Sequence, residues 1–202
     1  MKRLITFVLT FSVLSFMVIS TSSAAATHKV VKGDTMWKIA VKYETGLSEI
    51  KSANTHIKNP DLIYPGQILN IPNTESSIAS YEREVIRLVN EHRRANGLHQ
   101  LSYDWELSRV ARIKSQDMKD GGYFAHNSPT YGTPFQMMKN FGIKYKSAAE
   151  NIAKGYSTPK MVVDGWMNSS GHSANILNPS FTHIGVGYVS DGNYWTQMFI
   201  SK

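Results

Sequence analysis

The chain has 202 residues, of which 42% are apolar and 18% charged, and it contains no cysteine. This composition excludes collagen-like, disordered and disulfide-stapled proteins, and the length suits either one ordinary domain or a small module followed by a medium one. Lys and Arg outnumber Asp and Glu by 22 to 15, which gives a formal net charge of +7. The charge forms no basic block, so nothing beyond bulk charge supports nucleic-acid binding.

The N-terminal 26 residues have the pattern of an export signal. Lys2 and Arg3 precede an uncharged apolar stretch, and Ala24-Ala25-Ala26 ends it. A basic start, an apolar centre and small residues before a cleavage point are typical of a secretory signal peptide, so we expect cleavage after Ala26. The alternative is an uncleaved anchor, but this stretch falls short of the usual ~20-residue span. We therefore predict an exported chain with no stable membrane span after cleavage, and the absence of cysteine favours a Gram-positive bacterium.

Residues 27–73 predict a small unit in the order strand, helix, helix, strand. Asp34 or Thr35 can cap the first helix, and Gly46 ends it. We expect Trp37 on that helix to lie in the core and not to form a ligand platform. The remaining elements are strands at 28–31 and 67–71 and a second helix at 47–53.

Three motifs run through this unit in order: V-x-x-GDT-x-x-x-IA, L-x-x-I-x-x-AN and NP-x-x-I-x-PGQ-x-L-x-IP. Together they cover nearly all of it, and the unit resembles a LysM module. The resemblance implies binding to peptidoglycan or another N-acetylglucosamine glycan, in a groove between two loops. Carried over to this sequence, the glycan-binding loops consist of Gly33, Asp34, Thr35, Met36, Leu62, Ile63, Tyr64, Pro65 and Gly66.

After a short polar linker at 74–80, residues 81–202 predict a second domain of the α+β class. Helices are expected early and strands late, which argues against alternating βαβ units. The turn 191–193 joins the last two strands into a hairpin. The expected helices are 81–96, 106–120, 133–140 and 160–168, and the expected strands are 184–189 and 194–200.

Five motifs occur in order along this second domain: VNEHRRANGLHQLSYDWELSRVA, YFAHNSP, AENIA, W-x-x-SSGHSANIL and FTHIGVGY. In that order they resemble a CAP domain, the superfamily of cysteine-rich secretory, antigen-five and pathogenesis-related proteins, in its cysteine-free bacterial form. The resemblance implies an α-β-α sandwich with a cleft on one side. The whole chain is then a small βααβ LysM module followed by a CAP sandwich.

In animal and plant members of this superfamily the cleft holds two His and two Glu residues. His126 of YFAHNSP matches the first His and Glu150 of AENIA the first Glu, but Ser169 and Tyr194 stand at the other two positions. A metal site built like the eukaryotic one is therefore in doubt. His172 of SSGHSANIL matches the motif histidine of the bacterial branch and would complete a triad with His126 and Glu150.

Three interpretations of this triad remain open. A carboxylate beside an imidazole raises its basicity and fixes its tautomer, which provides a general base for activating water. Two nitrogens and one oxygen also suit a divalent metal such as zinc, although no cofactor is firmly indicated. The third interpretation is a buried hydrogen-bond network that holds loops to the sandwich. Ser128, Ser169 and Ser173 flank the histidines, but the chain has no G-x-S-x-G elbow to support a nucleophilic serine.

Three classes of function follow from this organisation. The first is an exported protein of the cell wall or spore envelope, anchored on peptidoglycan by LysM, whose CAP domain acts on wall material as a hydrolase. The second is a non-enzymatic ligand-binding module. The third is a structural or assembly protein of the envelope. Catalysis requires His126 and Glu150 to face an open cleft, whereas a carrier requires an apolar pocket.

Overall fold

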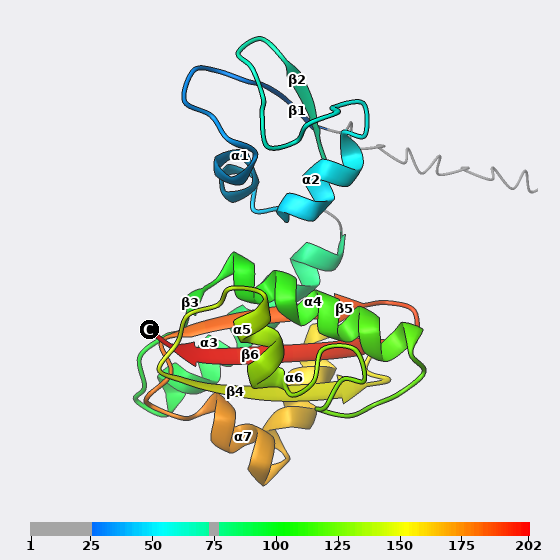
Figure 1. Cartoon of the computed structure of the whole chain (residues 1–202). Helices are drawn as coiled ribbons and strands as arrows, with labels where there is room; N and C mark the ends of the chain where they lie inside the picture. The colour runs from blue at the N-terminus through cyan, green and yellow to red at the C-terminus, as the bar shows by residue number, and fades with distance from the viewer. Residues whose placement is uncertain (1–25, 73–76) are drawn as a thin grey trace, which may run out of the picture.

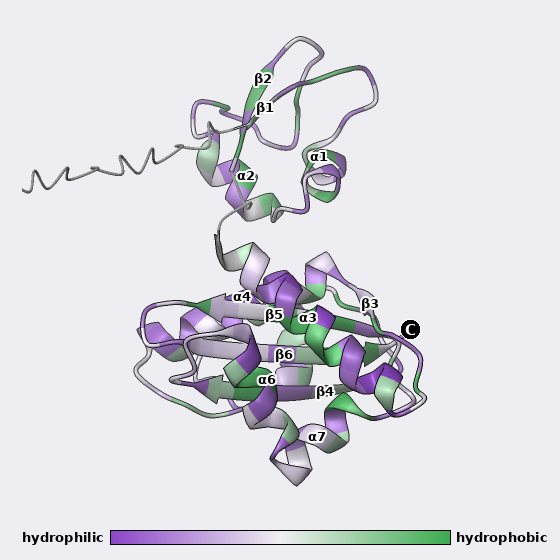
Figure 2. Cartoon of the chain, turned by 180° about the vertical axis from the view of Figure 1, so that it is seen from behind, coloured by the Kyte–Doolittle hydropathy of each residue, from purple (hydrophilic) through white to green (hydrophobic). Residues whose placement is uncertain are grey.

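The computed structural model describes residues 26–72 and 77–202, so the predicted signal peptide lies outside the described residues except for Ala26. Figures 1 and 2 show its two units from opposite sides. We name residues 26–72 the N-terminal unit and residues 77–202 the C-terminal unit. The C-terminal unit combines helices with a four-stranded sheet, which confirms the predicted α+β class. No helix within the described ranges has the length and hydropathy that a membrane span needs.

The N-terminal unit has the predicted order of strand, helix, helix and strand. Strand β1 (Ala26–Lys29) pairs antiparallel with β2 (Ile68–Ile71), and α1 (Met36–Lys42) and α2 (Leu47–Ala53) lie between them in sequence. Thr35 caps α1 by accepting a hydrogen bond from the Lys38 amide. The core consists of Val30, Met36, Ile39, Ala40, Ile50, Leu69 and Ile71.

The expected place of Trp37 in this core is wrong, because its side chain is 51% exposed. Helix α1 has only seven residues and buries one face. Met36, Ile39 and Ala40 occupy that face at the i, i+3, i+4 spacing of a helix. Trp37 follows Met36 by one position and is therefore rotated away from the core.

The C-terminal unit is built on a sheet with the strand order β3-β5-β6-β4. Strand β4 is an edge strand that pairs antiparallel with β6, so its free edge is open to the loops and helices around it. The strands are β3 (Ser102–Tyr103), β4 (Ser147–Lys154), β5 (His183–Val189) and β6 (Tyr194–Ser201). The helices are α3 (Ser77–Ala95), α4 (Trp105–Asp120), α5 (Pro134–Asn140), α6 (Pro159–Met167) and α7 (Ser170–Ile176).

Helices cover both faces of this sheet, which gives an α-β-α sandwich. One face packs against α3, α6 and α7 in a core that includes Val89, Trp166 and Phe199. The other packs against α4 and α5 in a core that includes Leu107 and Met198. Since side chains alternate between the faces of a strand, neighbouring residues of β4 point into different layers.

Two glycines of β5 allow α4 to lie directly on the sheet. A Cβ atom at Gly185 would meet the backbone of Leu107 at 2.4 Å, and one at Gly187 would meet the amide of Arg112 at 2.1 Å. Neither position accepts a side chain without moving the helix. This close approach sets α4 over the sheet, and α4 carries the residues that position the candidate site.

The structure differs from the predicted elements at four places, one of which is the two-residue strand β3, which was not predicted. Helix α3 begins at Ser77, inside the stretch that we expected to be a linker. Strand β4 and helix α7 were not predicted as elements, although their sequences AENIA and SSGHSANIL were recognised as motifs. Both carry residues of the candidate site.

Candidate functional site

The centre of the candidate site is a hydrogen-bonded pair formed by His126 and Glu150. The Nδ1 atom of His126 lies 2.8 Å from Oε1 of Glu150. Glu150 is on the edge strand β4, and its side chain is 2% exposed, whereas the His126 ring is 52% exposed. The pair therefore combines a buried carboxylate with a half-exposed imidazole. The other ring nitrogen, Nε2, takes no part in this hydrogen bond.

Lys114 on α4 supports the pair from inside the domain. This lysine is fully buried, and its Nζ donates to the backbone oxygen of His126 at 2.8 Å and to the Tyr123 hydroxyl at 3.2 Å. Burial lowers the pKa of Lys114, opposed by the negative charges of Glu150 and Asp117. Burial likewise raises the pKa of Glu150, opposed by the His126 hydrogen bond and the Lys114 charge.

The loop that carries His126 is fastened to α4 through Asp117 and Ser128. The Ser128 hydroxyl donates to Oδ2 of Asp117 at 2.6 Å and accepts from the amides of Thr130 and Tyr131. The Tyr123 hydroxyl donates to the same carboxylate, and burial together with this bond raises the pKa of Tyr123 to about 12. Ser128 thus shapes the loop, and its hydroxyl is fully engaged in doing so.

His172 is held apart from the pair. It lies on α7, next to the face of the sheet opposite to α4, and its ring makes no hydrogen bond to His126 or Glu150. Burial lowers the pKa of His172, and the nearby His126 ring lowers it further. The two rings thus interact electrostatically without forming a bonded triad.

A chain of amide side chains fills the layer beneath α7. Asn175 donates to Oδ1 of Asn151 at 2.9 Å, and Asn151 donates to Oε1 of Gln197 at 3.0 Å and to the backbone oxygen of His172 at 3.2 Å. These bonds join β6, β4 and α7. Sequence analysis did not connect these amides with one another, because they come from three segments far apart in the chain.

A three-ligand metal site, one of the interpretations left open for the triad, does not fit this arrangement. Among the described residues, no three His, Cys, Asp or Glu side chains are grouped to hold a metal ion. Glu150 Oε2 is instead buried with no partner in the described structure. Most buried carboxylate oxygens have a hydrogen-bond donor, so this atom is an exception within the site.

Of the two loops expected to bind glycan, the one at 62–66 is joined to the end of the first strand, where the amide of Gly66 donates to the oxygen of Val30 at 2.9 Å. Several of their residues serve the fold. Asp34 accepts from the Val31 amide and pairs with His28 Nε2, both at 2.9 Å, and these hydrogen bonds lower the pKa of Asp34. Met36 is 4% exposed and belongs to the core.

Leu62 and Tyr64, by contrast, are more than half exposed. They line a cavity of about 460 Å³ that also includes His56, Ile57, Lys58, Asn59, Gln67 and Ile68. The structure therefore extends the candidate glycan surface beyond the loop at 62–66 to both flanking segments. The sequence signal that pointed to these flanks was the pair of turns at 59–60 and 65–66, which brings them together.

Comparison with known proteins agrees with this architecture. The cysteine-rich secretory protein family, CAP, matches residues 86–200, and the LysM domain matches residues 28–72. The chain belongs to the CAP family. Its CAP domain is preceded by a LysM domain, as the motifs of both units predicted, so the N-terminal unit is the LysM domain.

Three known proteins illustrate the similarity. The uncharacterized protein YkwD of Bacillus subtilis is 62% identical over 127 residues, which are 63% of this chain and 49% of YkwD. A probable peptidoglycan endopeptidase of the same bacterium, LytE, is 40% identical over 77 residues, 38% of this chain and 22% of LytE. The crystal structure of an extracellular SCP-domain protein from Bacillus anthracis superposes with a TM-score of 0.60 at 35% identity, covering 68% of this chain and 47% of that chain. The chain spans about half the length of YkwD and of the B. anthracis protein.

Proposed function

We propose that this chain is an exported protein of the cell wall that is held on N-acetylglucosamine glycan by its LysM domain and hydrolyses a wall component with its CAP domain. The LysM match over residues 28–72 supports the anchor. The name of LytE, a probable peptidoglycan endopeptidase, supports the choice of wall material as substrate. The site supports a type of reaction, hydrolysis by an activated water molecule. It does not identify the bond that is cleaved.

The observation that carries the catalytic part is the His126–Glu150 pair. With Nδ1 bonded to a buried carboxylate, the His126 ring presents Nε2 to the solvent side as a base. Glu150 fixes the tautomer and stabilises the imidazolium that forms when Nε2 takes a proton from water. Lys114 and the loop anchor at Ser128 keep the ring in this position.

The direct test uses purified peptidoglycan sacculi and the full two-domain protein. Pelleting reports the anchor, and mass spectrometry of the supernatant reports released fragments. We expect wild type to pellet and to release fragments, and His126→Ala to pellet equally but to release them at least about 100-fold more slowly, the usual contribution of a general base.

His99→Ala is the matched control, because His99 is exposed and the hydrogen bond at that residue is accepted by its backbone oxygen. It should behave as wild type in both assays. Pelleting without fragments, from wild type, would contradict the hydrolase and leave a non-enzymatic or structural wall protein. Fragments without pelleting would contradict the anchor.

A further inference from the structure

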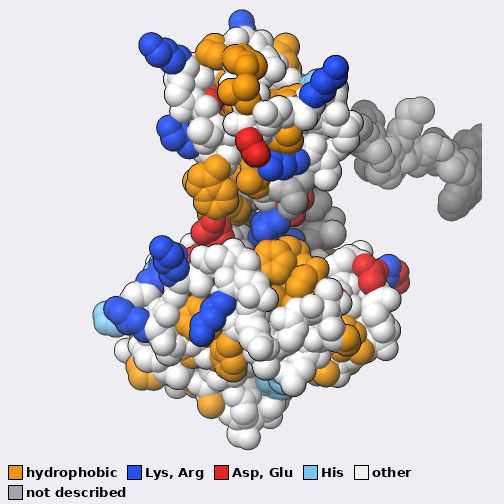
Figure 3. Space-filling view, in the orientation of Figure 1, with side chains coloured by type: hydrophobic (Ala, Val, Ile, Leu, Met, Phe, Trp, Pro, Cys, Tyr) orange, Lys and Arg blue, Asp and Glu red, His pale blue; other side chains and the backbone are white. Residues whose placement is uncertain are grey.

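A groove runs between the two domains, away from the His126–Glu150 pair. Its larger part has a volume of about 690 Å³ and is lined by Trp37 of the LysM domain and by CAP residues Asp104, Glu106, Phe141 and Tyr145, with Gly142, Ile143, Lys144, Lys146 and Lys202. A second cavity of about 270 Å³ also borders Trp37, Glu106 and Phe141. Figure 3 shows this region as a narrow waist with hydrophobic, basic and acidic side chains around it.

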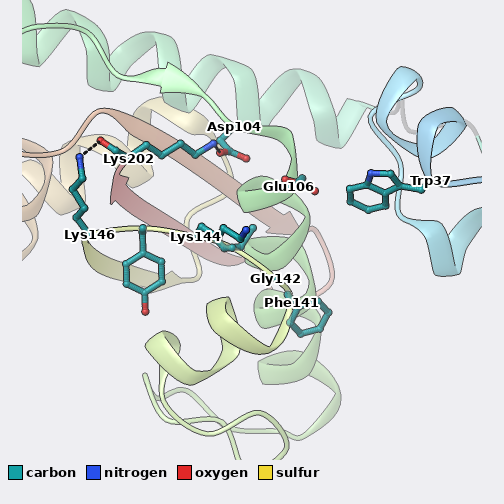
Figure 4. Close-up of a pocket in the computed structure, with 10 residues that line it drawn as sticks. Trp37, Asp104, Glu106, Phe141, Gly142, Lys144, Lys146 and Lys202 are labelled. Atoms are coloured by element: carbon teal, nitrogen blue, oxygen red, sulfur yellow. Dashed lines mark hydrogen bonds and ion pairs between the residues drawn. The ribbon is translucent and has the colours of Figure 1, made fainter.

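The two domains are bridged beside this groove by ion pairs. Arg109 on α4 donates to both carboxylate oxygens of Glu49, at 3.1 and 3.2 Å. Arg83 and the Tyr103 hydroxyl approach Glu44 at 3.5 and 3.4 Å. Trp37 therefore faces the CAP domain across an open space and not in a packed interface, which is why half of it stays exposed (Figure 4).

Aromatic side chains at the groove suit the apolar face of a sugar ring. The indole of Trp37 projects towards α4 and Glu106 in Figure 4. Phe141 lies on the opposite wall, with the Arg109 guanidinium 5.7 Å from its ring centre. In the sequence, Trp37 follows directly after the candidate glycan loop 33–36.

The charges in the groove suit an anionic ligand that also carries hydroxyl groups. Lys144 is exposed and has no hydrogen bond or ion pair with any described residue. Lys146 is also exposed, and it donates to the backbone oxygen of Lys202 at 3.2 Å. Asp104 is neutralised by Lys202 at 2.7 Å, and Glu106 remains as an acceptor for hydroxyl or amide hydrogens.

We propose that this groove is a second glycan site, which binds the strand of peptidoglycan that continues from the LysM domain. Trp37 stacks on a sugar ring, Glu106 accepts from its hydroxyl or acetamido groups, and Lys144 and Lys146 face the carboxylates of the strand. This inference rests on the proposed glycan anchor. The groove would make the protein bind long, acidic strands more tightly than a neutral N-acetylglucosamine oligomer.

The test measures calorimetric binding of two probes to the full two-domain protein: peptidoglycan strands freed of their peptides, which keep the lactyl carboxylate, and a neutral N-acetylglucosamine tetramer. Trp37→Ala should weaken binding of the strands about tenfold, the effect of losing one stacked ring, and leave the tetramer unchanged. A Lys144→Ser, Lys146→Ser double variant should weaken strand binding and reduce its dependence on salt. Phe135→Ala is the control, since this ring is 47% exposed but lies outside the groove.

Tryptophan fluorescence gives a second readout. Trp37 is more than half exposed, Trp105 is partly exposed, and Trp166 and Trp195 are buried. Strand binding should therefore reduce acrylamide quenching in wild type more than in Trp37→Ala. Equal strand affinity in wild type and Trp37→Ala, with the tetramer bound by both, would overturn the groove site and leave the anchor intact. No binding of either probe by wild type would overturn the anchor and the groove together. Protection of Trp37 by teichoic acid but not by strands would overturn the choice of ligand.

Discussion

Glu150 and Asn151 are neighbours on one edge strand, yet they belong to two different environments. Glu150 points towards α4, where it meets a half-exposed imidazole and a buried lysine charge. Asn151 points towards α7, where it belongs to a chain of neutral amides. A charged group next to a solvent-facing ring can move protons, whereas an amide chain can only fix geometry. We propose from this difference that the chemistry lies on the α4 side and that the α7 side has a structural role.

The same comparison explains why a bonded triad is absent. His172 belongs to the amide side, where its backbone oxygen accepts from Asn151. Its ring makes no hydrogen bond to His126 or Glu150 among the described residues. A histidine on that side contributes charge repulsion to His126 and not a third hydrogen bond.

The largest change in stability that we predict comes from removing the buried charge of Lys114, next to the His126–Glu150 pair. Lys114→Met should lower the free energy of unfolding by about 3 kcal/mol, because Glu150 would be buried without its nearest cation and the His126 oxygen would lose its donor. Urea denaturation measures this loss. Lys119→Met, on the same helix but partly exposed, should cost less than about 1 kcal/mol. Equal losses in the two variants would show that the buried charge has no special role.

A smaller effect is expected on the amide side. Asn151→Ala removes the central member of the chain and should lower the free energy of unfolding by about 1–3 kcal/mol, the cost of leaving buried partners unsatisfied. Fragment release from sacculi by the folded variant should stay within about threefold of wild type, since this factor is well below a general-base effect. A hundredfold loss of release in a folded Asn151→Ala protein would erase the distinction between the two sides.

The smallest effect concerns the pH dependence of His172. Because burial lowers the pKa of His172 in the folded protein below the ordinary histidine value of about 6.5, the unfolded state binds protons more readily. The stability associated with this group is present above pH 6.5 and is lost as pH falls through the folded pKa. His172→Gln should flatten this part of the melting-temperature profile. A profile that is unchanged by the substitution would assign the acid sensitivity to another group.

Much of the architecture could be predicted because local patterns and tertiary contacts agree. The apolar spacing of α4 and the hairpin of β5 and β6 were both predicted from sequence, and the structure confirms them. Strand β4 was not predicted, since Glu150 and Asn151 interrupt its apolar run. These polar residues are tolerated there because each finds a partner in a different layer.

The site could be predicted only in part. The motifs indicated His126 and Glu150, but Lys114 was missed because a lysine is normally placed on a solvent face. Its position between Ala111 and Met118 on the apolar stripe of α4 was the available signal. Arg93 is a similar case, buried while donating to the backbone oxygens of His99, Ile176 and Asn178. The exposure of Trp37 could have been predicted, because the i, i+3, i+4 spacing of Met36, Ile39 and Ala40 already turns Trp37 away from the core.

We propose that the His126–Glu150 pair, on the α4 side of β4, hydrolyses wall material. The amide chain through Asn151, on the α7 side, holds this part of the fold in place. The most direct test compares fragment release from sacculi by wild type, Glu150→Gln and Asn151→Ala, each checked for folding by circular dichroism. We predict release by wild type and Asn151→Ala and loss of release in Glu150→Gln, with all three proteins pelleting alike. Undiminished release by Glu150→Gln would contradict the account, because the carboxylate behind His126 would then have no part in the reaction.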